Sequence, residues 1–370
     1  MIVGVLKEPP FEPRVSLLAE STAVLTKKNI EVWVESDAGI RSYSGNDDYI
    51  QSGSAIKKRE DIIGGADILL SIHQQGIPAN LRDKILIGVY QPLYNAGLMK
   101  EWASRNLICF SLDMLPRTTR AQSMDVLSSQ ANIAGYKSVL LAAGEFPRYF
   151  PMFMTAAGTI PPAKVLILGA GVAGLQAVAT AKRLGAVVEV FDTRPAVKEE
   201  VLSLGAKFIE VEGAADASQA GGYAVQQTEQ FQLKQKEKIA ETLAKADVVI
   251  TTAQIPGKQA PILISKDMIA TMKKGSLIID LAAATGGNTA LTKNDETIVE
   301  SGVKIIGNSN LAATMPSDAS RLYGRNLLNF LQLIIDKENK INLNYHDDLV
   351  NGSCIMRDGD VVNEKIRSLA

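Results

Sequence analysis

Three glycines follow the apolar segment 165–168 with the spacing GxGxxG, at Gly169, Gly171 and Gly174. In this pattern the first glycine makes a tight turn, the second lets the backbone approach a pyrophosphate, and the third lets the next helix pack against the strand. The phosphate would bind at the N-terminus of that helix, where amide groups and the helix dipole favour an anion. The spacing predicts a dinucleotide site. The alternative is a glycine-rich turn that binds no nucleotide.

An acidic residue ends the next predicted strand. Asp192 comes 18 residues after Gly174, close to the distance of about 20 expected for a ribose-binding carboxylate. A carboxylate there accepts hydrogen bonds from the ribose 2′-hydroxyl and repels a 2′-phosphate, so we expect NAD rather than NADP. Arg194 argues the other way, because a nearby arginine can accommodate that phosphate.

Residues 117–136 form a second polar segment, in which Asp125 is the only charged residue from position 121 to position 136. A long helix is predicted over 121–144. Six polar side chains fall within one arc of it, at about 100° per residue: Gln122, Asp125, Ser128, Ser129, Asn132 and Tyr136. A solvent-facing stripe would carry Lys and Glu. The stripe therefore fits either a wall that meets a polar ligand or a helix buried against another domain or subunit.

Composition limits the remaining chemistry. The 370 residues include 39 Lys and Arg and 40 Asp and Glu, a net charge of −1, whereas a nucleic-acid binder would show a basic excess. Two cysteines are too few for a cysteine zinc site, and His73 and His346 lie too far apart to form a metal site. So few histidines also limit acid–base catalysis. We expect His73 to be a loop residue at a strand end, with an acid–base role as the alternative, and His346 to lie on the surface.

Strand and helix patterns alternate twice along the chain, which indicates two α/β domains with parallel sheets. The first would combine residues 1–125 with 320–370, and the second would span 140–312, with 154–165 as the joint. Asn351-Gly352 and Asp358-Gly359 predict a C-terminal β-meander. The polar loop 213–232, with Tyr223 after two glycines, is either disordered or a lid. No segment is long and apolar enough to span a membrane.

Together these segments resemble the alanine dehydrogenase/pyridine nucleotide transhydrogenase family, and most closely the NAD(H)-binding alpha subunit (domain I) of its proton-translocating NAD(P) transhydrogenases. Eight segments carry the resemblance: KEPPFEPRVSL (7–17), RTTRAQSMDVLSSQANIAGY (117–136), TAAGTIPPAKVLILGAGVAGLQA (155–177), FDTRPAVKEEV (191–201), AGGYA (220–224), TTAQIPGKQAP (251–261), IIDLAAATGGN (278–288) and YGRNLLNFL (323–331).

The resemblance implies two Rossmann-like domains joined by long helices, and a homodimer that exchanges hydride between its NAD(H) and NADP(H) on a partner domain. It also implies separate membrane subunits for proton movement, so the chain would be cytoplasmic and peripheral to the membrane. The implied nicotinamide-end residues are Arg117, Gln122, Asp125 and Ser128. The implied cofactor contacts are Gly169, Gly171, Val172, Gly174, Asp192, Thr193, Arg194, Gly222, Tyr223, Thr252 and Ala253, with the Tyr223 loop closing over the nucleotide.

The two branches of this family differ in the chemistry they need. The alanine dehydrogenases have a Lys on the strand that aligns with 66–72 and a His on the next strand. Here Ser71 stands at the lysine position, 89–93 contains no His, and Arg14, which matches their substrate-carboxylate Arg, lacks these partners. Hydride transfer between two nicotinamides needs no proton acceptor, only two rings positioned together and shielded from water. We therefore predict a transhydrogenase subunit, with an alanine dehydrogenase-like amino-acid oxidoreductase or a non-catalytic NAD-binding module as alternatives.

Overall fold

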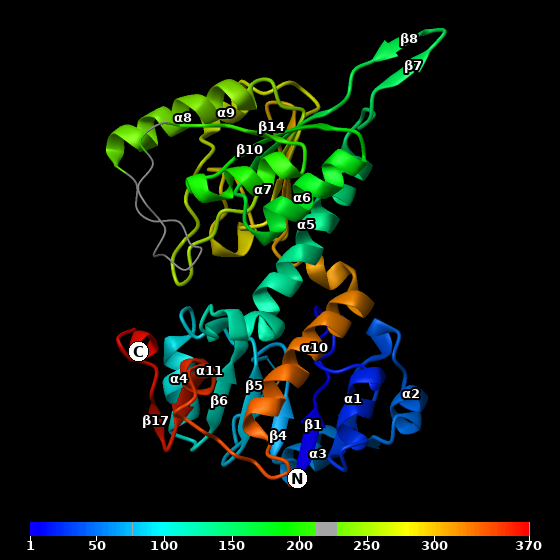
Figure 1. Ribbon diagram of the computed structural model, residues 1–370, viewed down its shortest axis with the longest axis vertical. Helices are drawn as coiled ribbons and strands as arrows, with labels where there is room; N and C mark the ends of the chain where they lie inside the picture. Colours follow the sequence, from blue (N-terminus) through cyan, green and yellow to red (C-terminus); the bar gives the residue numbers. More distant parts are fainter. Residues whose placement is uncertain (76, 212, 214–227, 370) are drawn as a thin grey trace. The chain divides into compact units, whose positions relative to one another are not determined.

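The computed structural model describes residues 1–75, 77–211, 213 and 228–369 (Figure 1). The chain divides into two compact units: unit 1 comprises residues 1–130 with 313–370, and unit 2 comprises residues 131–312. Helix α5 (Val126–Glu145) runs through the first boundary, and helix α10 (Pro316–Ile334) begins just after the second. The predicted fold class, two Rossmann-like α/β domains joined by long helices, is confirmed.

Unit 1 is built on an eight-stranded sheet in the order β17-β16-β6-β5-β4-β1-β2-β3. Its six parallel strands follow the order 3-2-1-4-5-6 of a doubly wound nucleotide-binding sheet. The strands are β1 (Ile2–Val5), β2 (Glu31–Glu35), β3 (Ala55–Lys57), β4 (Ile68–Leu70), β5 (Ile85–Gly88) and β6 (Ile108–Ser111), with antiparallel β16 (Cys354–Arg357) and β17 (Asp360–Val361) at one edge.

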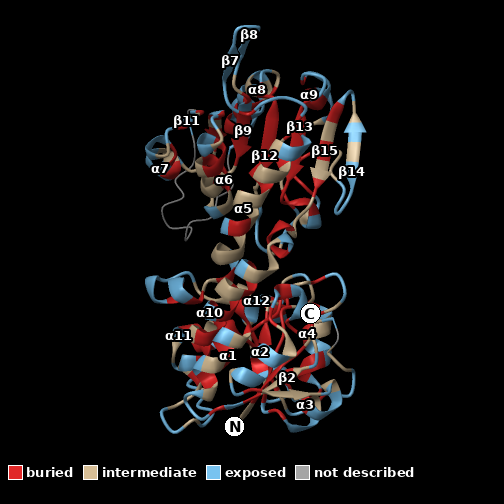
Figure 2. Cartoon of the chain, turned by 90° about the vertical axis from the view of Figure 1, so that its right-hand side faces the viewer, coloured by how far each residue is buried: buried red, intermediate tan, exposed pale blue. Residues whose placement is uncertain are grey.

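Helices cover both faces of this sheet, because successive strand residues point to opposite sides. Val3 and Val5 pack in the same cluster as residues of α1, α10 and α11, whereas Leu69 belongs to a cluster with α3, α4 and α12. These helices are α1 (Ala19–Thr26), α3 (Arg59–Gly65), α4 (Ala96–Ala103), α11 (Asp348–Ser353) and α12 (Glu364–Arg367), and α2 (Asn46–Gln51) follows β2. Figure 2 shows the strands as the buried centre of the unit.

Unit 2 repeats this plan with a seven-stranded sheet in the order β11-β10-β9-β12-β13-β15-β14. Its six parallel strands again follow 3-2-1-4-5-6, and only β14 is antiparallel. The strands are β9 (Lys164–Leu168), β10 (Val187–Phe191), β11 (Lys207–Phe208), β12 (Val248–Thr251), β13 (Leu277–Asp280), β14 (Thr297–Glu300) and β15 (Val303–Gly307). One face packs against α5, α6 (Val172–Arg183) and α7 (Lys198–Ser203), and the other against α8 (Glu229–Leu243) and α9 (Lys266–Ala270).

The structure differs from the predicted elements in three places. Residues 154–165 are not a joint: they lie inside unit 2, where β7 (Phe153–Thr155) and β8 (Gly158–Ile160) form an exposed hairpin (Figure 1). Asn351-Gly352 lies in helix α11, so the tail forms one hairpin, which turns at Asp358-Gly359. The helix predicted from residue 121 begins at Val126, after the 3₁₀ segment η3 (Thr119–Met124).

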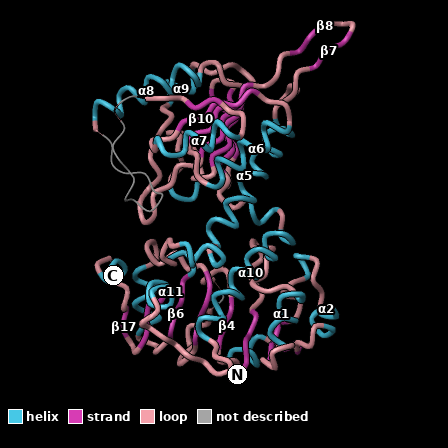
Figure 3. The backbone as a smooth tube through the Cα atoms, viewed as in Figure 1, coloured by secondary structure: helices cyan, strands magenta, loops and turns pink. Residues whose placement is uncertain are grey.

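Figure 3 shows how loops connect the strand ends of each unit. Within the described ranges, none of the helices combines the length and apolar character needed to cross a bilayer.

Candidate functional site

The glycine loop lies between strand β9 and helix α6 in unit 2, and its three glycines have three different surroundings. Gly169 has φ +107°, and a Cβ there would collide with Thr252 Oγ1. A Cβ on Gly174 would overlap the carbonyl oxygen of Gly169, whereas one on Gly171 would meet no atom within 4 Å. The first and third glycines therefore make the turn and its packing possible. The second leaves space beside the N-terminus of α6, where Val172 is half exposed.

Asp192 follows β10 and is hydrogen-bonded on both oxygens. Oδ2 accepts from the Ala170 amide at 2.7 Å and from Arg194 Nη2 at 2.7 Å. Oδ1 accepts from the amide and Nε of Arg194 at 2.8 and 2.9 Å. The carboxylate thus joins the glycine loop to the segment that contains Thr193. Its hydrogen bond also raises the pKa of the Arg194 guanidinium. A ribose hydroxyl could bind this carboxylate only if Arg194 moved.

Thr252 and Ala253 follow β12, the strand beside β9, and form the other side of the point where the strand order reverses. Thr252 donates from its amide to the carbonyl of Leu168 at 2.9 Å and from Oγ1 to the carbonyl of Gly169 at 3.2 Å. Buried Asn288 exchanges hydrogen bonds of 3.0 and 2.8 Å with Ala253. Open α/β sheets bind ligands at such switch points. The structure therefore brings the glycine loop, Asp192, Thr252 and Ala253 to one edge of one sheet.

Two residues of this edge were missed by sequence reasoning. Asn288 also donates to the carbonyl of Pro261 at 2.9 Å, and its amide donates to Asp280 Oδ2 at 2.7 Å. Asp280 ends β13, so a polar residue at the end of a buried apolar strand was the available signal. The predicted residues Gly222 and Tyr223 lie outside the described residues.

The nicotinamide-end candidates lie in unit 1, but not on one helical face. Gln122 is exposed on η3, and Asp125 has ψ 89°, outside the helical range. Asp125 instead caps α5, accepting from the Ser128 amide at 2.9 Å and from Ser128 Oγ at 2.6 Å. The predicted single arc is therefore wrong. A helix cap needs an extended backbone at the capping residue, and this interrupts the 3.6-residue period.

The remaining members of the predicted arc belong to α5. Ser129 lies in unit 1, and its hydroxyl donates to the carbonyl of Val126 at 3.1 Å. Asn132 and Tyr136 belong to unit 2, where Asn132 Nδ2 donates to Gln176 Oε1 at 3.3 Å. Arg117 is exposed in the segment before η3.

A cluster of charged side chains occupies the corresponding switch point of unit 1. Arg14 donates from Nε and Nη2 to the two oxygens of Glu12 at 2.8 and 2.7 Å, and Nη1 donates to Gln130 Oε1 at 2.8 Å. His73, in the loop after β4, lies with Nε2 2.7 Å from the same carboxylate. Arg14 is therefore not left without partners. Glu12, at 0% exposure, takes the position of an anionic partner.

Two carboxylates of this cluster titrate abnormally. Burial raises the pKa of Glu8 to about 7, although its oxygens accept from the amides of Ile72 and His73. Burial would also raise the pKa of Glu12, but hydrogen bonds from Arg14 and His73 outweigh it and hold that pKa well below the ordinary value. Ser71 Oγ lies 3.0 Å from the hydroxyl of Tyr90, and both are buried. The local sequence contained Glu12 and Arg14, but not their contact with His73.

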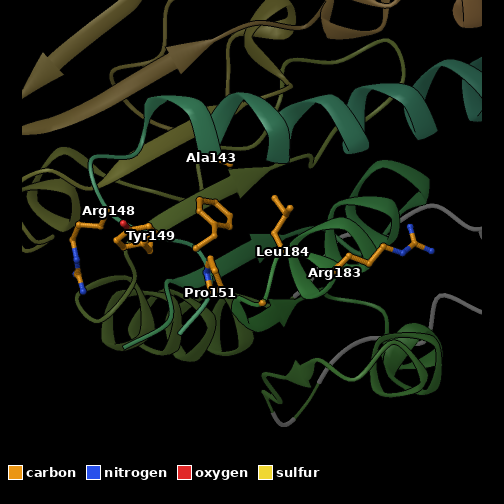
Figure 4. A pocket seen from close by; sticks show the side chains of 8 residues that line it. Ala143, Arg148, Tyr149, Pro151, Arg183 and Leu184 are labelled. Carbon is orange, nitrogen blue, oxygen red and sulfur yellow. The ribbon is translucent and has the colours of Figure 1, made fainter. Parts of the chain in front are cut away.

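A pocket of about 490 Å³ lies elsewhere in unit 2, beside the β7–β8 hairpin (Figure 4). No predicted cofactor residue lines it. Its lining comes from the end of α5, the segment before β7 and the end of α6: Ala143, Arg148, Tyr149, Phe150, Pro151, Arg183, Leu184 and Gly185. Among the residues that the structure covers, no group of three or more His, Cys, Asp or Glu is arranged to hold a metal ion.

Comparisons with known proteins agree with this geometry. Residues 4–134 match the family model of the alanine dehydrogenase/PNT N-terminal domain, and residues 138–364 match that of the C-terminal domain. The chain is 43% identical to an NAD(P) transhydrogenase subunit alpha polypeptide of Rhodospirillum rubrum, over 98% of each chain. A crystal structure of transhydrogenase from Sinorhizobium meliloti matches with a TM-score of 0.89 and 41% identity, over 98% of this chain and 100% of that one. An alanine dehydrogenase of Staphylococcus epidermidis is 25% identical, over 91% of this chain and 88% of that one.

Proposed function

The chain belongs to the alanine dehydrogenase/pyridine nucleotide transhydrogenase family, and we propose that it is the NAD(H)-binding subunit of a proton-translocating NAD(P) transhydrogenase. Its reaction is the direct exchange of hydride between NAD(H) bound to this chain and NADP(H) bound to a partner domain. Separate membrane subunits couple this exchange to proton movement, and the chain associates with the membrane through them.

The observation that carries the proposal is the glycine loop at the switch point of unit 2. The space above Gly171, at the start of the 12-residue helix α6, fits a pyrophosphate, which the helix N-terminus favours electrostatically. Asp192 and Thr193 contact the adenosine ribose once Arg194 has moved, and Thr252 and Ala253 border the nucleotide. Arg117, Gln122, Asp125 and Ser128 orient the nicotinamide end, and Tyr223 closes over the nucleotide. Bound NAD(H) supplies or accepts the hydride.

Unit 1 supports transhydrogenase over amino-acid oxidation. An amino-acid oxidoreductase has to bind a substrate carboxylate and move protons. Here the buried Arg14 guanidinium is held by both oxygens of Glu12, and Ser71 takes the position of the family's lysine. Displacing Glu12 would leave two buried charges to be compensated, which is costly. Hydride exchange between two nicotinamides requires neither group.

Mixing this chain with an NADP(H)-binding transhydrogenase domain tests the proposal directly. We expect hydride transfer from NADH to an NADP analogue, followed by absorbance, and no NADH formation from L-alanine and NAD. NADH formation from L-alanine would favour the dehydrogenase. NADH binding without transfer would favour a non-catalytic NAD-binding module.

We also propose a homodimer, formed through the β7–β8 hairpin. A two-stranded hairpin is marginally stable alone, yet both strands are exposed, and Met154 is 73% exposed. Tyr149 stacks on Phe153 with ring centroids 4.8 Å apart, beside the pocket of unit 2. A second copy of the chain would cover these apolar side chains. Sedimentation should show a dimer for the wild type and a monomer for Met154→Asp, and a wild-type monomer would contradict the proposal.

A further inference from the structure

The exposed segment that carries Arg117 and Gln122 is held on two sides by elements far away in the sequence. On one side, Asn326 and Asn329 of α10 both donate from Nδ2 to the carbonyl of Ser123, at 2.8 and 2.9 Å. Beneath the segment, Ala121 and Met124 are buried in the core of unit 1. These contacts fix the end of η3, but they do not reach Arg117 or the residues just after it.

Helix α11 holds the other side through Arg120. Arg120 donates from Nη1 and Nη2 to the two oxygens of Asp347, each at 2.7 Å, and Nη2 also contacts Asp348. Paired donors of this kind fix orientation as well as distance, because the planar guanidinium matches the carboxylate. The hydrogen bonds from Arg120 also hold the pKa of Asp347 below its ordinary value, so the pair stays charged at neutral pH.

Asp347 is itself held rigidly. Its Oδ1 accepts from the amides of Leu349 and Val350, at 2.9 and 3.3 Å, as the N-cap of α11. The same helix packs closely on Pro116, because a Cβ on Gly352 would collide with the proline ring. Helix α11 therefore contacts the segment before Arg117, at Pro116, and after it, at Arg120.

We propose that Asp347 and Arg120 are positioning residues for hydride transfer: their ion pair fixes the segment from which Arg117 and Gln122 reach the nicotinamide. This inference rests on the proposed function and deepens it. Neither residue touches the reacting atoms. Because hydride transfer depends steeply on the placement of the two rings, a small displacement of this segment slows transfer more than it weakens binding.

The test compares Arg120→Gln with Arg321→Gln in the full chain mixed with an NADP(H)-binding domain. Arg321 is the matched control, because it forms a similarly exposed ion pair with Glu20 in the same unit. We expect Arg120→Gln to lower the single-turnover transfer rate by about tenfold while NADH Kd changes less than about threefold. Arg321→Gln should change neither, and Arg120→Lys should recover much of the rate.

Asp347→Asn with Asp348→Asn should reproduce the loss, because asparagine still caps α11 but carries no charge. Adding Arg120→Gln to that pair should cause little further loss. The inference fails if Arg120→Gln transfers hydride like wild type, if its NADH Kd rises in proportion to the lost rate, or if Arg321→Gln behaves the same. A wild-type chain that transfers no hydride would overturn the proposed function instead. Unchanged amide exchange over residues 117–124 in Arg120→Gln would then still reject the anchor.

Discussion

The two units share one strand order but use its switch point differently. Each carries an acid and an arginine two residues apart after the first or second strand of the sheet: Glu12 with Arg14 in unit 1, and Asp192 with Arg194 in unit 2. In unit 2 the acid lies beside a glycine loop with open space above Gly171. In unit 1 the pair is closed in, because His73 and Gln130 also bind it.

The difference shows that the position in the fold alone does not make a ligand site. In unit 2 the backbone provides the binding groups, since a helix N-terminus can accept an anion without any buried charge. In unit 1 the charges are present but already satisfy one another. A buried pair of this kind is costly to open from one side. The first arrangement favours an incoming nucleotide, and the second favours a closed edge.

The largest expected effect is at Gly174. Gly174→Ala places a methyl group against the carbonyl of Gly169, and we expect strain of about 3 kcal/mol, enough to weaken NADH binding by about 100-fold. Calorimetric titration with NADH and thermal unfolding would measure both consequences. Gly171→Ala is the control: it should unfold like wild type, because nothing lies within 4 Å of its Cβ, yet still weaken NADH binding. Full NADH affinity in Gly171→Ala would place the pyrophosphate elsewhere.

Glu12→Gln should damage unit 1 without touching the nucleotide. It leaves the Arg14 guanidinium buried beside a neutral group, since the two side chains are 0% and 8% exposed, at a cost of about 3–5 kcal/mol. Urea unfolding would measure the loss, and NADH Kd should remain within about twofold of wild type. Glu20→Gln, which breaks the exposed pair with Arg321, should cost less than about 1 kcal/mol. Equal losses from the two substitutions would show that the unit 1 edge is not locked by its ion pair.

Glu8 gives unit 1 a pH dependence. Its pKa is about 7 in the folded chain and about 4.3 when unfolded, so the folded state holds the extra proton between these values. Stability from this group is therefore full below about pH 4 and is lost as pH rises to about 7, by up to about 3 kcal/mol. Glu8→Gln keeps the neutral form and should stabilise the chain more at pH 8 than at pH 5. Urea unfolding at both pH values would measure this, and a gain independent of pH would contradict the shifted pKa.

Sequence reasoning reached the features that depend on neighbouring residues. The glycine spacing and Asp192 predicted the unit 2 edge, because both belong to one strand–turn–helix segment. It could not reach contacts such as Arg120 with Asp347, which are 227 positions apart. It also misplaced Asp125: a periodic pattern assumes one continuous helix, whereas that carboxylate ends the 3₁₀ segment by capping α5. The closed state of the unit 1 edge depended on the fold bringing His73 to Glu12.

The smallest expected effect, at Arg194, tests whether the unit 2 edge is as open as its glycine loop. Arg194 donates to Asp192 from its amide and, through Nε and Nη2, from its side chain. Arg194→Gln should therefore free the carboxylate for the ribose and tighten NADH binding by less than about tenfold. It should also weaken NADPH binding, because the guanidinium then no longer offsets the repulsion between Asp192 and a 2′-phosphate.

Asp192→Asn is the matched control for Arg194→Gln, and it should weaken NADH binding by about 1.5–3 kcal/mol. Calorimetry with both nucleotides separates the two roles that an arginine can have here. If Arg194→Gln weakens NADH binding, the guanidinium contacts the nucleotide. If the substitution tightens NADH binding while NADPH binding weakens, the guanidinium masks the acid. In that case unit 2 uses an acid–arginine pair as a reversible cover, whereas unit 1 uses one as a permanent lock.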